Sequence, residues 1–340
     1  LQNALLLAMG LMTTVTFAQD WNVDSRTRID MSGDNDKMVT NQRATLGATW
    51  GGSDWGIHMS SDVNYMLSNQ AATGELTMDI YEAYASTDVM GYANVTAGRQ
   101  ALNYGSGALI SSRDWGTDRT TWDGFKIGLD LDMADVTIGY ASMNDGGADS
   151  NGVANGSNGN MFLNAGGEFS GWNVNLVYMT TTTDGESGEN AATGIDISGE
   201  VMGAGISASM NSDFDGDEMR VIGLTYAVND DMGVNVSQTV YGEDGGFNMA
   251  GTNMSGADWS NGQMAYLNGG DEMLSYGLTY AISGINLGYT MHNVTSLDES
   301  ERDVTEISLG YSLNDNAGLS LSMVDDNETK YMWVTLNVGL

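Results

Sequence analysis

The chain has 340 residues with no cysteine and no proline, and its 45 acidic against 11 basic residues give a net charge of −34. The lack of cysteine excludes disulfides, cysteine-ligated zinc and thiol catalysis. The strong negative charge opposes binding to nucleic acid phosphates, so we expect no nucleic acid partner. Fifteen tyrosines and eight tryptophans in short alternating runs argue against a disordered acidic chain.

The first 18 residues have the character of a secretory signal. An apolar run, Ala-Leu-Leu-Leu-Ala-Met-Gly-Leu-Met, is followed by Thr-Val-Thr-Phe-Ala, which predicts cleavage after Ala18. The positively charged leader of such a signal is missing, so we expect the sequence to start inside it; a buried N-terminal helix is the alternative. No other stretch approaches the ~20 apolar residues of a membrane-spanning helix. We therefore predict a signal peptide at 1–18 and one domain at 19–340.

From Trp21 onward the chain repeats runs of about ten residues in which apolar and polar side chains alternate. For example, Trp172, Val174 and Leu176 alternate with Asn173 and Asn175. A period of two predicts β-strands, and no convincing helical period is present. The predicted strands are 21–31, 40–50, 55–66, 75–87, 92–100, 122–132, 134–143, 160–168, 172–180, 193–200, 202–211, 218–227, 232–241, 273–281, 284–292, 303–312, 317–325 and 328–340.

The connections between these strands alternate between tight turns and long loops. This alternation is typical of an up-and-down antiparallel β-barrel in an outer membrane, with turns on the periplasmic side and loops outside. We predict an all-β transmembrane barrel of about 18 strands, with 16 as the alternative, in the cell outer membrane. Its expected partners are outer-membrane lipid and lipopolysaccharide, and a homotrimer is possible. A soluble all-β domain is the competing interpretation.

If the apolar faces contact lipid, the polar faces line an aqueous lumen. This places Arg26, Arg28, Arg43, Asp62 and Lys126 inside. Eight of the eleven basic residues lie before residue 127, so a basic wall would face an acidic wall formed by the remaining strands. Such a transverse field sorts solutes by charge. Alternatively, the arginines only pair with neighbouring carboxylates and set the pore size.

The segment 98–125, Gly-Arg-Gln-Ala-Leu-Asn-Tyr-Gly to Trp-Asp-Gly-Phe, contains a loop of about twenty residues with three arginines. A loop of this length is typically functional or disordered, and its aromatic residues argue against disorder. We expect residues 101–121 to fold into the lumen as a constriction that contains Arg113 and Arg119. Strand alternation points Arg99 away from the lumen unless a bulge at Gly98 turns it inward; without a bulge it lies at the rim.

The pattern Gly-Arg-Gln, Tyr-Gly, Ser-Arg-Asp-Trp, Arg and Asp-Gly in this segment resembles the alginate-export family of outer-membrane β-barrels. Elsewhere the resemblance is one of strand rhythm. It implies a monomeric eighteen-stranded barrel whose lumen arginines pass an anionic polysaccharide, with Arg99, Arg113 and Arg119 at the positions of the motif's arginines. The excess of acids instead favours cations or neutral solutes.

The stretch Ser-Asp-Phe-Asp-Gly-Asp-Glu places Asp213, Asp215 and Asp217 at alternate positions. Carboxylates at this spacing could bind Ca²⁺, although the distal glutamate of a twelve-residue calcium loop is missing. A solvated acidic surface is the simpler interpretation. We expect no other cofactor.

Enzymatic motifs are not recognisable. His58 and His292 are the only histidines, and neither has a nucleophile or metal partner nearby in sequence. We therefore predict a passive, cation-preferring porin for small hydrophilic solutes or ions, and no enzymatic activity. A structural surface-array protein with calcium-binding acidic loops, or a polysaccharide export channel, is the alternative.

Overall fold

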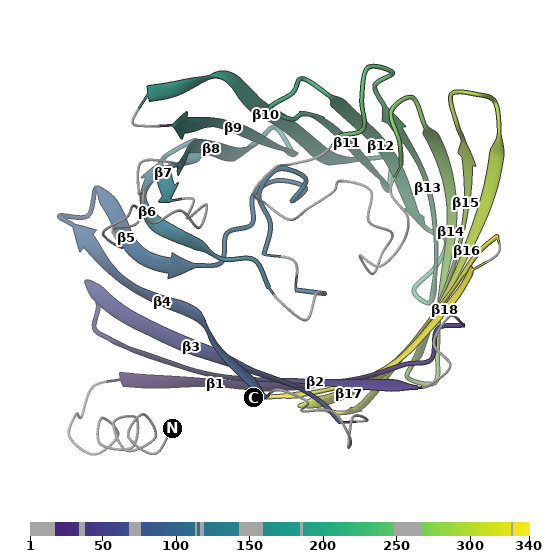
Figure 1. Cartoon of the computed structure of the whole chain (residues 1–340), viewed down its shortest axis with the longest axis horizontal. Coiled ribbons are helices and arrows are strands. Elements are labelled where there is room, and N and C mark those ends of the chain that lie inside the picture. Colours follow the sequence, from purple (N-terminus) through teal and green to yellow (C-terminus); the bar gives the residue numbers. More distant parts are fainter. Residues whose placement is uncertain are drawn as a thin grey trace, which may run out of the picture.

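The computed structural model describes residues 18–33, 38–67, 76–112, 114–115, 119–142, 159–183, 186–247, 267–327 and 329–340. These residues form eighteen antiparallel strands that close into one barrel (Figure 1). The strands are β1 (Ala18–Asp30), β2 (Val39–Gly51), β3 (Trp55–Met66), β4 (Thr77–Val89), β5 (Ala93–Gln100), β6 (Trp122–Leu131), β7 (Ala134–Ser142), β8 (Gly159–Phe169), β9 (Trp172–Thr183), β10 (Glu186–Val201), β11 (Ala204–Ser212), β12 (Glu218–Ala227), β13 (Met232–Tyr241), β14 (Glu272–Ile282), β15 (Ile285–Thr295), β16 (Glu301–Asn314), β17 (Ala317–Asp326) and β18 (Thr329–Gly339).

The barrel closes because its last strand pairs with its first. Asp24 lies opposite Gly339 and Asp30 lies opposite Trp333, and every other strand pairs with its neighbours in sequence. Closure gives each of the eighteen strands a hydrogen-bonded neighbour on both sides, which is the condition for a sheet to cross a hydrocarbon layer. Within the described residues, no helix has the length and apolar character needed to cross a membrane.

The two faces of the barrel differ as the alternation predicts. Large apolar side chains on the outer face are exposed around the circumference, for example Leu46 on β2, Ile138 on β7 and Ile222 on β12, which are 51%, 44% and 60% exposed. A continuous exposed apolar belt of this kind is unfavourable in water. It is the surface that outer-membrane barrels present to lipid.

The connections at one end of the barrel are tight. Four turns contain a residue pair in which both members have positive φ: Met90–Gly91, Ser170–Gly171, Met202–Gly203 and Ser283–Gly284. Positive φ at both central residues defines a type I′ turn, whose twist matches that of the flanking strands. The long connections, including 101–121 between β5 and β6, lie at the opposite end of the strands. The predicted sorting of connections by length holds for most of the barrel. It is wrong for 181–192, because β9 ends at Thr183 and β10 begins at Glu186.

The predicted eighteen strands are confirmed, and the alternative of 16 strands is wrong. The largest difference in bounds is at β10, which begins at Glu186 and not at residue 193. Residues 186–192 carry small and polar residues at successive positions, so they give no period-two signal. Residues 1–17 of the predicted signal peptide lie outside the described residues, and that assignment stays a prediction.

Candidate functional site: a loop that crosses the lumen

The connection between β5 and β6 lies inside the ring of strands (Figure 1). We call its described residues, 101–112, 114–115 and 119–121, the lumen loop. A bridge between Tyr104 and Ile110 gives the loop a hairpin-like core. The Asn103 side chain supports this core, because its Oδ1 accepts the backbone N–H of Ser112 at 2.8 Å and its Nδ2 donates to Ser112 Oγ at 3.0 Å.

Apolar packing fixes the middle of the lumen loop against β8–β10. Leu109 and Ile110 are 1% and 0% exposed, and the Tyr104 ring lies 5.7 Å from that of Phe162 on β8. Gly194 on β10 leaves room for this packing, since a Cβ there would lie 2.9 Å from Leu109 Cδ1. Full burial of a Leu or Ile side chain stabilises by about 1.5–3 kcal/mol, so these two residues alone hold the segment firmly.

Hydrogen bonds attach the same part of the loop to β10 and β11. The backbone N–H of Ser106 donates to Asp196 Oδ2 at 2.9 Å, and Ser209 Oγ donates to Ser106 Oγ at 3.3 Å. Gly105 has a positive φ of 57°, and a Cβ there would overlap Asp196 Oδ2. Glycine is therefore required both for the turn and for the close approach of the loop backbone to this wall.

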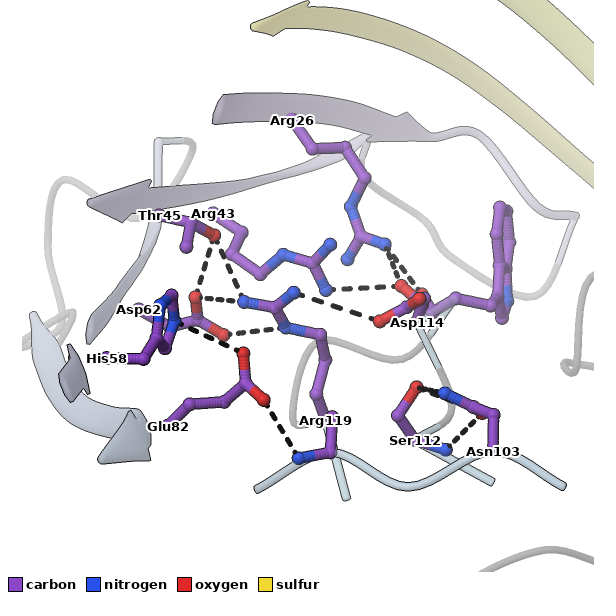
Figure 2. Close-up of polar contacts among 12 residues, drawn as sticks. Arg26, Arg43, Thr45, His58, Asp62, Glu82, Asn103, Ser112, Asp114 and Arg119 are labelled. Atoms are coloured by element: carbon purple, nitrogen blue, oxygen red, sulfur yellow. Dashed lines mark hydrogen bonds and ion pairs between the residues drawn. The ribbon is translucent and has the colours of Figure 1, made fainter. Parts of the chain in front are cut away.

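The other end of the lumen loop lies against β1 and β2 (Figure 2). Arg26 Nη1 donates to the carbonyl oxygens of Asp114 and Trp115, both at 2.9 Å. Arg43 Nη1 donates to the Asp114 carbonyl at 3.1 Å. Arg28 Nη1 donates to the Trp115 carbonyl at 2.9 Å, and its guanidinium carbon lies 3.2 Å from the centroid of the Trp115 ring. Three arginines thus converge on two consecutive backbone carbonyls.

A buried ion pair joins the loop to β3. Arg119 donates through Nε to Asp62 Oδ2 at 2.9 Å and through Nη2 to Asp62 Oδ1, and Nη2 also donates to Thr45 Oγ1 at 3.1 Å. Desolvation lowers the pKa of Arg119, but the hydrogen bonds and charge of Asp62 outweigh it and raise the pKa above the usual arginine value. Bidentate pairing of this kind fixes geometry as well as charge.

A β-bulge in β4 completes the contact. The register between β3 and β4 shifts between Ser60 and Ser61, which leaves Tyr81 as the extra residue. The Arg119 guanidinium carbon lies 3.3 Å from the centroid of the Tyr81 ring. Bulges commonly redirect a side chain next to a functional site, and this one supplies an aromatic face for the arginine.

The lumen loop therefore reaches both β1–β4 and β8–β11, and it narrows the channel between them. The wall formed by β12–β17 differs, because its inward positions near the tight turns carry small or polar residues such as Gly288, Ser308 and Ser322. These residues border a cavity of about 620 Å³. Among the residues that the structure describes, side chains of this size leave space on that side of the lumen.

The structure brings together five of the predicted lumen residues: Arg26, Arg28, Arg43, Asp62 and Arg119. All five are less than a tenth exposed, with the value for Arg119 referring to its side chain. They are buried because the lumen loop covers them. Lys126 is half-buried and lies on the same inward face of β6 as Trp122 and Gly124. Arg113 lies outside the described residues, so its assignment stays a prediction.

The prediction that Arg99 lines the pore is wrong. Arg99 pairs in register with Asp123, and β5 has no register shift at Gly98. Its Nε and Nη2 donate to the two Asp123 carboxylate oxygens at 2.7 Å each on the outer, exposed face. Without a bulge, the parity of the strand keeps this side chain at the rim, which was the alternative.

Sequence reasoning missed three residues that hold the loop: Thr45, Tyr81 and Trp115, which contact the arginines. Alternation alone places Asp196 inside the barrel, and the structure shows that it contacts the loop on the opposite wall. The role of Tyr81 depends on a bulge, and that of Trp115 depends on the path of the loop. Neither feature produces a periodic pattern of side chains that could be recognised in the sequence.

Each histidine lies between a hydroxyl and a glutamate on neighbouring strands. Thr49 Oγ1 is 2.8 Å from His58 Nδ1, and Glu82 Oε2 is 3.5 Å from His58 Nε2. Ser275 Oγ is 2.7 Å from His292 Nδ1, and Glu306 Oε1 is 4.0 Å from His292 Nε2. Both sets lie on strands of the barrel, where most backbone N–H groups are bonded within the sheet and cannot act as oxyanion donors. Next to Glu82, the bulge at Tyr81 interrupts the β3–β4 ladder. The absence of enzymatic activity stays a prediction.

The acidic turn at 213–217 is organised by one of its own carboxylates. Asp213 is 1% exposed, and its Oδ1 accepts the backbone N–H groups of Asp215 and Asp217, both at 3.0 Å. Within the described residues, no group of three acidic or histidine side chains is placed to hold a metal ion. The three aspartates thus form a turn here, and calcium binding stays a prediction.

Together, the closed barrel, its apolar outer belt and its lumen loop define a transmembrane β-barrel of the outer-membrane type. No family model matches the chain, and no curated protein matches it in sequence. Solved structures do match its fold. OccK11 (OpdR) of Pseudomonas aeruginosa has a TM-score of 0.72 at 10% identity, with 95% of this chain and 96% of that chain covered.

Two further structures agree. OccAB4 of Acinetobacter baumannii has a TM-score of 0.67 at 11% identity, covering 96% of this chain and 99% of that chain. OpdK of Pseudomonas aeruginosa, solved with vanillate, has a TM-score of 0.71 at 12% identity, covering 95% of this chain and 98% of that chain. These proteins are eighteen-stranded outer-membrane channels, and at such identities the likeness concerns the fold. These matches do not support the resemblance to the alginate-export family.

Proposed function

We propose that the protein is a passive diffusion channel of the outer membrane for small hydrophilic solutes, with a preference for cations. The observation that carries the proposal is the lumen loop. It is attached to two opposite walls by buried hydrogen bonds, an ion pair and apolar packing, while the wall of β12–β17 carries small inward side chains. Among the described residues, the lumen loop and this wall leave an aqueous passage that is narrowed but not closed.

The distribution of charge supports the preference for cations. Arg26, Arg28 and Arg43 are covered by the lumen loop and donate to its carbonyls, so a passing solute does not contact their guanidinium groups directly. On β6–β10, Asp130, Asp135, Glu168 and Glu200 are exposed at inward positions. Exposed carboxylates in a narrow lumen concentrate cations and repel anions.

Export of an anionic polysaccharide is the less favoured function. The resemblance of segment 98–125 to the alginate-export family supports it, but Arg99 faces outward and Arg119 is taken up by Asp62. Arg26, Arg28 and Arg43 donate to backbone carbonyls of the loop. We therefore propose small solutes, and not a polyanion, as the cargo.

Planar-bilayer recording of the purified, refolded protein tests the proposal. We expect steady open channels whose reversal potential in a KCl gradient has the sign of cation selectivity. Deletion of Gly105 to Gly116 removes the contacts with β8–β11 and the two carbonyls that bind Arg26, Arg28 and Arg43. It leaves the Arg119–Asp62 pair in place and should raise the single-channel conductance. Arg99→Gln, at the outer rim, is the matched control and should leave the conductance unchanged. Absence of any steady current from the wild-type protein would contradict the channel function.

A further inference from the structure

A second cavity of about 940 Å³ lies between the lumen loop and the opposite wall. It is bordered by Gly105 and Ser106 of the loop and by inward residues of β7–β12. Five of these inward residues lie in register across adjacent strands and so form one row: Asp135, Gly166, Asn175, Asp196 and Ser209. We call this space the β8–β11 cavity. The lumen loop borders the cavity on one side, so the contacts that fix the loop also fix the shape of the cavity.

Three polar atoms at this cavity have no hydrogen-bond partner among the residues that the structure describes. They are Asn164 Oδ1, Asn175 Nδ2 and Asp196 Oδ1, and each is buried. Asn164 is 8% exposed, so its amide is held in place by its surroundings. Buried polar groups are almost always hydrogen-bonded, because leaving them unpaired is costly. Two acceptors and one donor gathered at one cavity indicate a site that a polar ligand completes.

The charge at the cavity has one sign. Asp135, Glu168 and Asp196 border it, and no lysine or arginine does so among the described residues. The only basic residue between Lys126 and Arg302 is Arg220, which is exposed and pairs with Glu218 at the end of β12. Asp196 Oδ2 accepts the loop N–H of Ser106, and its other oxygen is left for a ligand.

We propose that the β8–β11 cavity binds a small organic cation that carries a hydroxyl group close to a protonated amine. The ammonium group donates to Asp196 Oδ1 and Asn164 Oδ1, and the hydroxyl oxygen accepts from Asn175 Nδ2. In the part of the chain that the structure describes, no aromatic side chain borders the cavity, so a neutral sugar finds no ring to stack on. The proposal rests on the channel function, because the cavity would be a solute-binding site along the channel.

Isothermal titration of the refolded protein in detergent with glucosamine, at a mildly acidic pH where its amine is protonated, tests the site. We expect saturable binding, with glucose binding at least about tenfold more weakly because it lacks the charge-assisted hydrogen bonds. Asp196→Asn should weaken glucosamine binding about tenfold. Asn164→Ala should also weaken it, and this variant leaves the Ser106–Asp196 contact in place.

Glu200→Gln is the matched control, because it removes one inward carboxylate from the same strand without touching the cavity. It should leave the affinity for glucosamine unchanged. Equal losses in Asp196→Asn and Glu200→Gln would overturn the site in favour of a diffuse acidic field, and equal binding of glucose and glucosamine would overturn the role of the amine. Titration does not depend on conduction. A protein that binds glucosamine but carries no current would refute the channel and leave the site standing.

Discussion

Arg119 and Asp62 lie 57 positions apart in sequence and form a two-bonded ion pair that joins the lumen loop to β3. Their side chains are 9% and 5% exposed, so water screens the pair weakly. Tyr81 stacks on the same guanidinium and Thr45 accepts from it. The pair is therefore an enclosed attachment between the loop and the β1–β4 side of the barrel.

Asp62→Asn should release the loop on this side. The substitution leaves the Arg119 charge buried, with Asp114 Oδ1 at 3.8 Å as its remaining carboxylate neighbour. Loss of one partner of a buried pair costs about 3–5 kcal/mol. We expect a larger and noisier single-channel conductance, together with faster proteolysis within residues 101–121.

Asp325→Asn serves as the control for that substitution. It breaks the 3.1 Å pair with Lys330, in which the lysine and aspartate side chains are 74% and 49% exposed. Exposed pairs contribute about 0–1 kcal/mol, so neither conductance nor proteolysis should change. If the two variants behave alike, the buried pair does not hold the loop.

Arg99→Ala should have little effect. Its partner Asp123 is also exposed, and both lie at the rim, one residue inside the loop ends of β5 and β6. Water reaches a pair at the rim, so we expect a change in unfolding free energy within about 1 kcal/mol. The reversal potential in a KCl gradient should equal that of the wild type. A shift toward cation selectivity would mean that Arg99 faces the permeating ions after all.

The strands could be predicted because lipid on one side and water on the other impose strict alternation along each strand. The turns could be predicted because glycine marks the positive φ of type I′ pairs such as Ser170–Gly171. The start of β10 could not be predicted, because the small and polar residues at 186–192 show no alternation between apolar and polar side chains. A strand boundary set only by backbone pairing leaves no trace in the side chains.

The site was only partly predictable for a related reason. Alternation places Arg26, Arg43 and Asp62 inside the barrel, but it cannot tell that a distant loop covers them. Contacts such as Arg28 with Trp115 depend on the path of the loop through the lumen. The sequence thus indicates which side chains face inward, and the fold decides which of these a solute can reach.

Glycine substitutions should separate backbone strain from steric clash. Gly171 has φ of +84°, and a Cβ added there would lie in open space with respect to the described residues, so Gly171→Ala should cost about 1–2 kcal/mol through strain alone. Gly98 has φ of +131°, and a Cβ there would overlap the Ala83 carbonyl oxygen. Gly98→Ala must displace β4 as well, so it should destabilise more. The midpoints of urea unfolding in lipid vesicles measure both losses of stability. Equal losses would mean that β4 can move away from the added Cβ at no cost in free energy.

The acidic turn at 213–217 allows a direct test of calcium binding against turn formation. Asp213→Ala removes the acceptor of two backbone N–H groups and should destabilise the turn by about 1–3 kcal/mol. The pKa of Asp217 is raised by desolvation and by the negative charges of Asp213, Asp215 and Asp244. A carboxyl with a raised folded-state pKa favours the folded turn at low pH, and this contribution is lost as the pH rises through that pKa. Asp217→Asn should therefore stabilise the turn slightly at neutral pH and have no effect in acid.

Calcium titration of thermal unfolding completes this test. If the aspartates only form a turn, Ca²⁺ should leave the midpoint of the wild-type protein unchanged. Asp215→Asn should then behave like the wild type, because the Asp215 carboxylate is not the acceptor that organises the turn. If a calcium site forms, Ca²⁺ should raise the midpoint by an amount that grows with its concentration, and Asp215→Asn and Asp217→Asn should each abolish the rise. That result would support the surface-array function, because it would give the acidic loops a ligand outside the lumen.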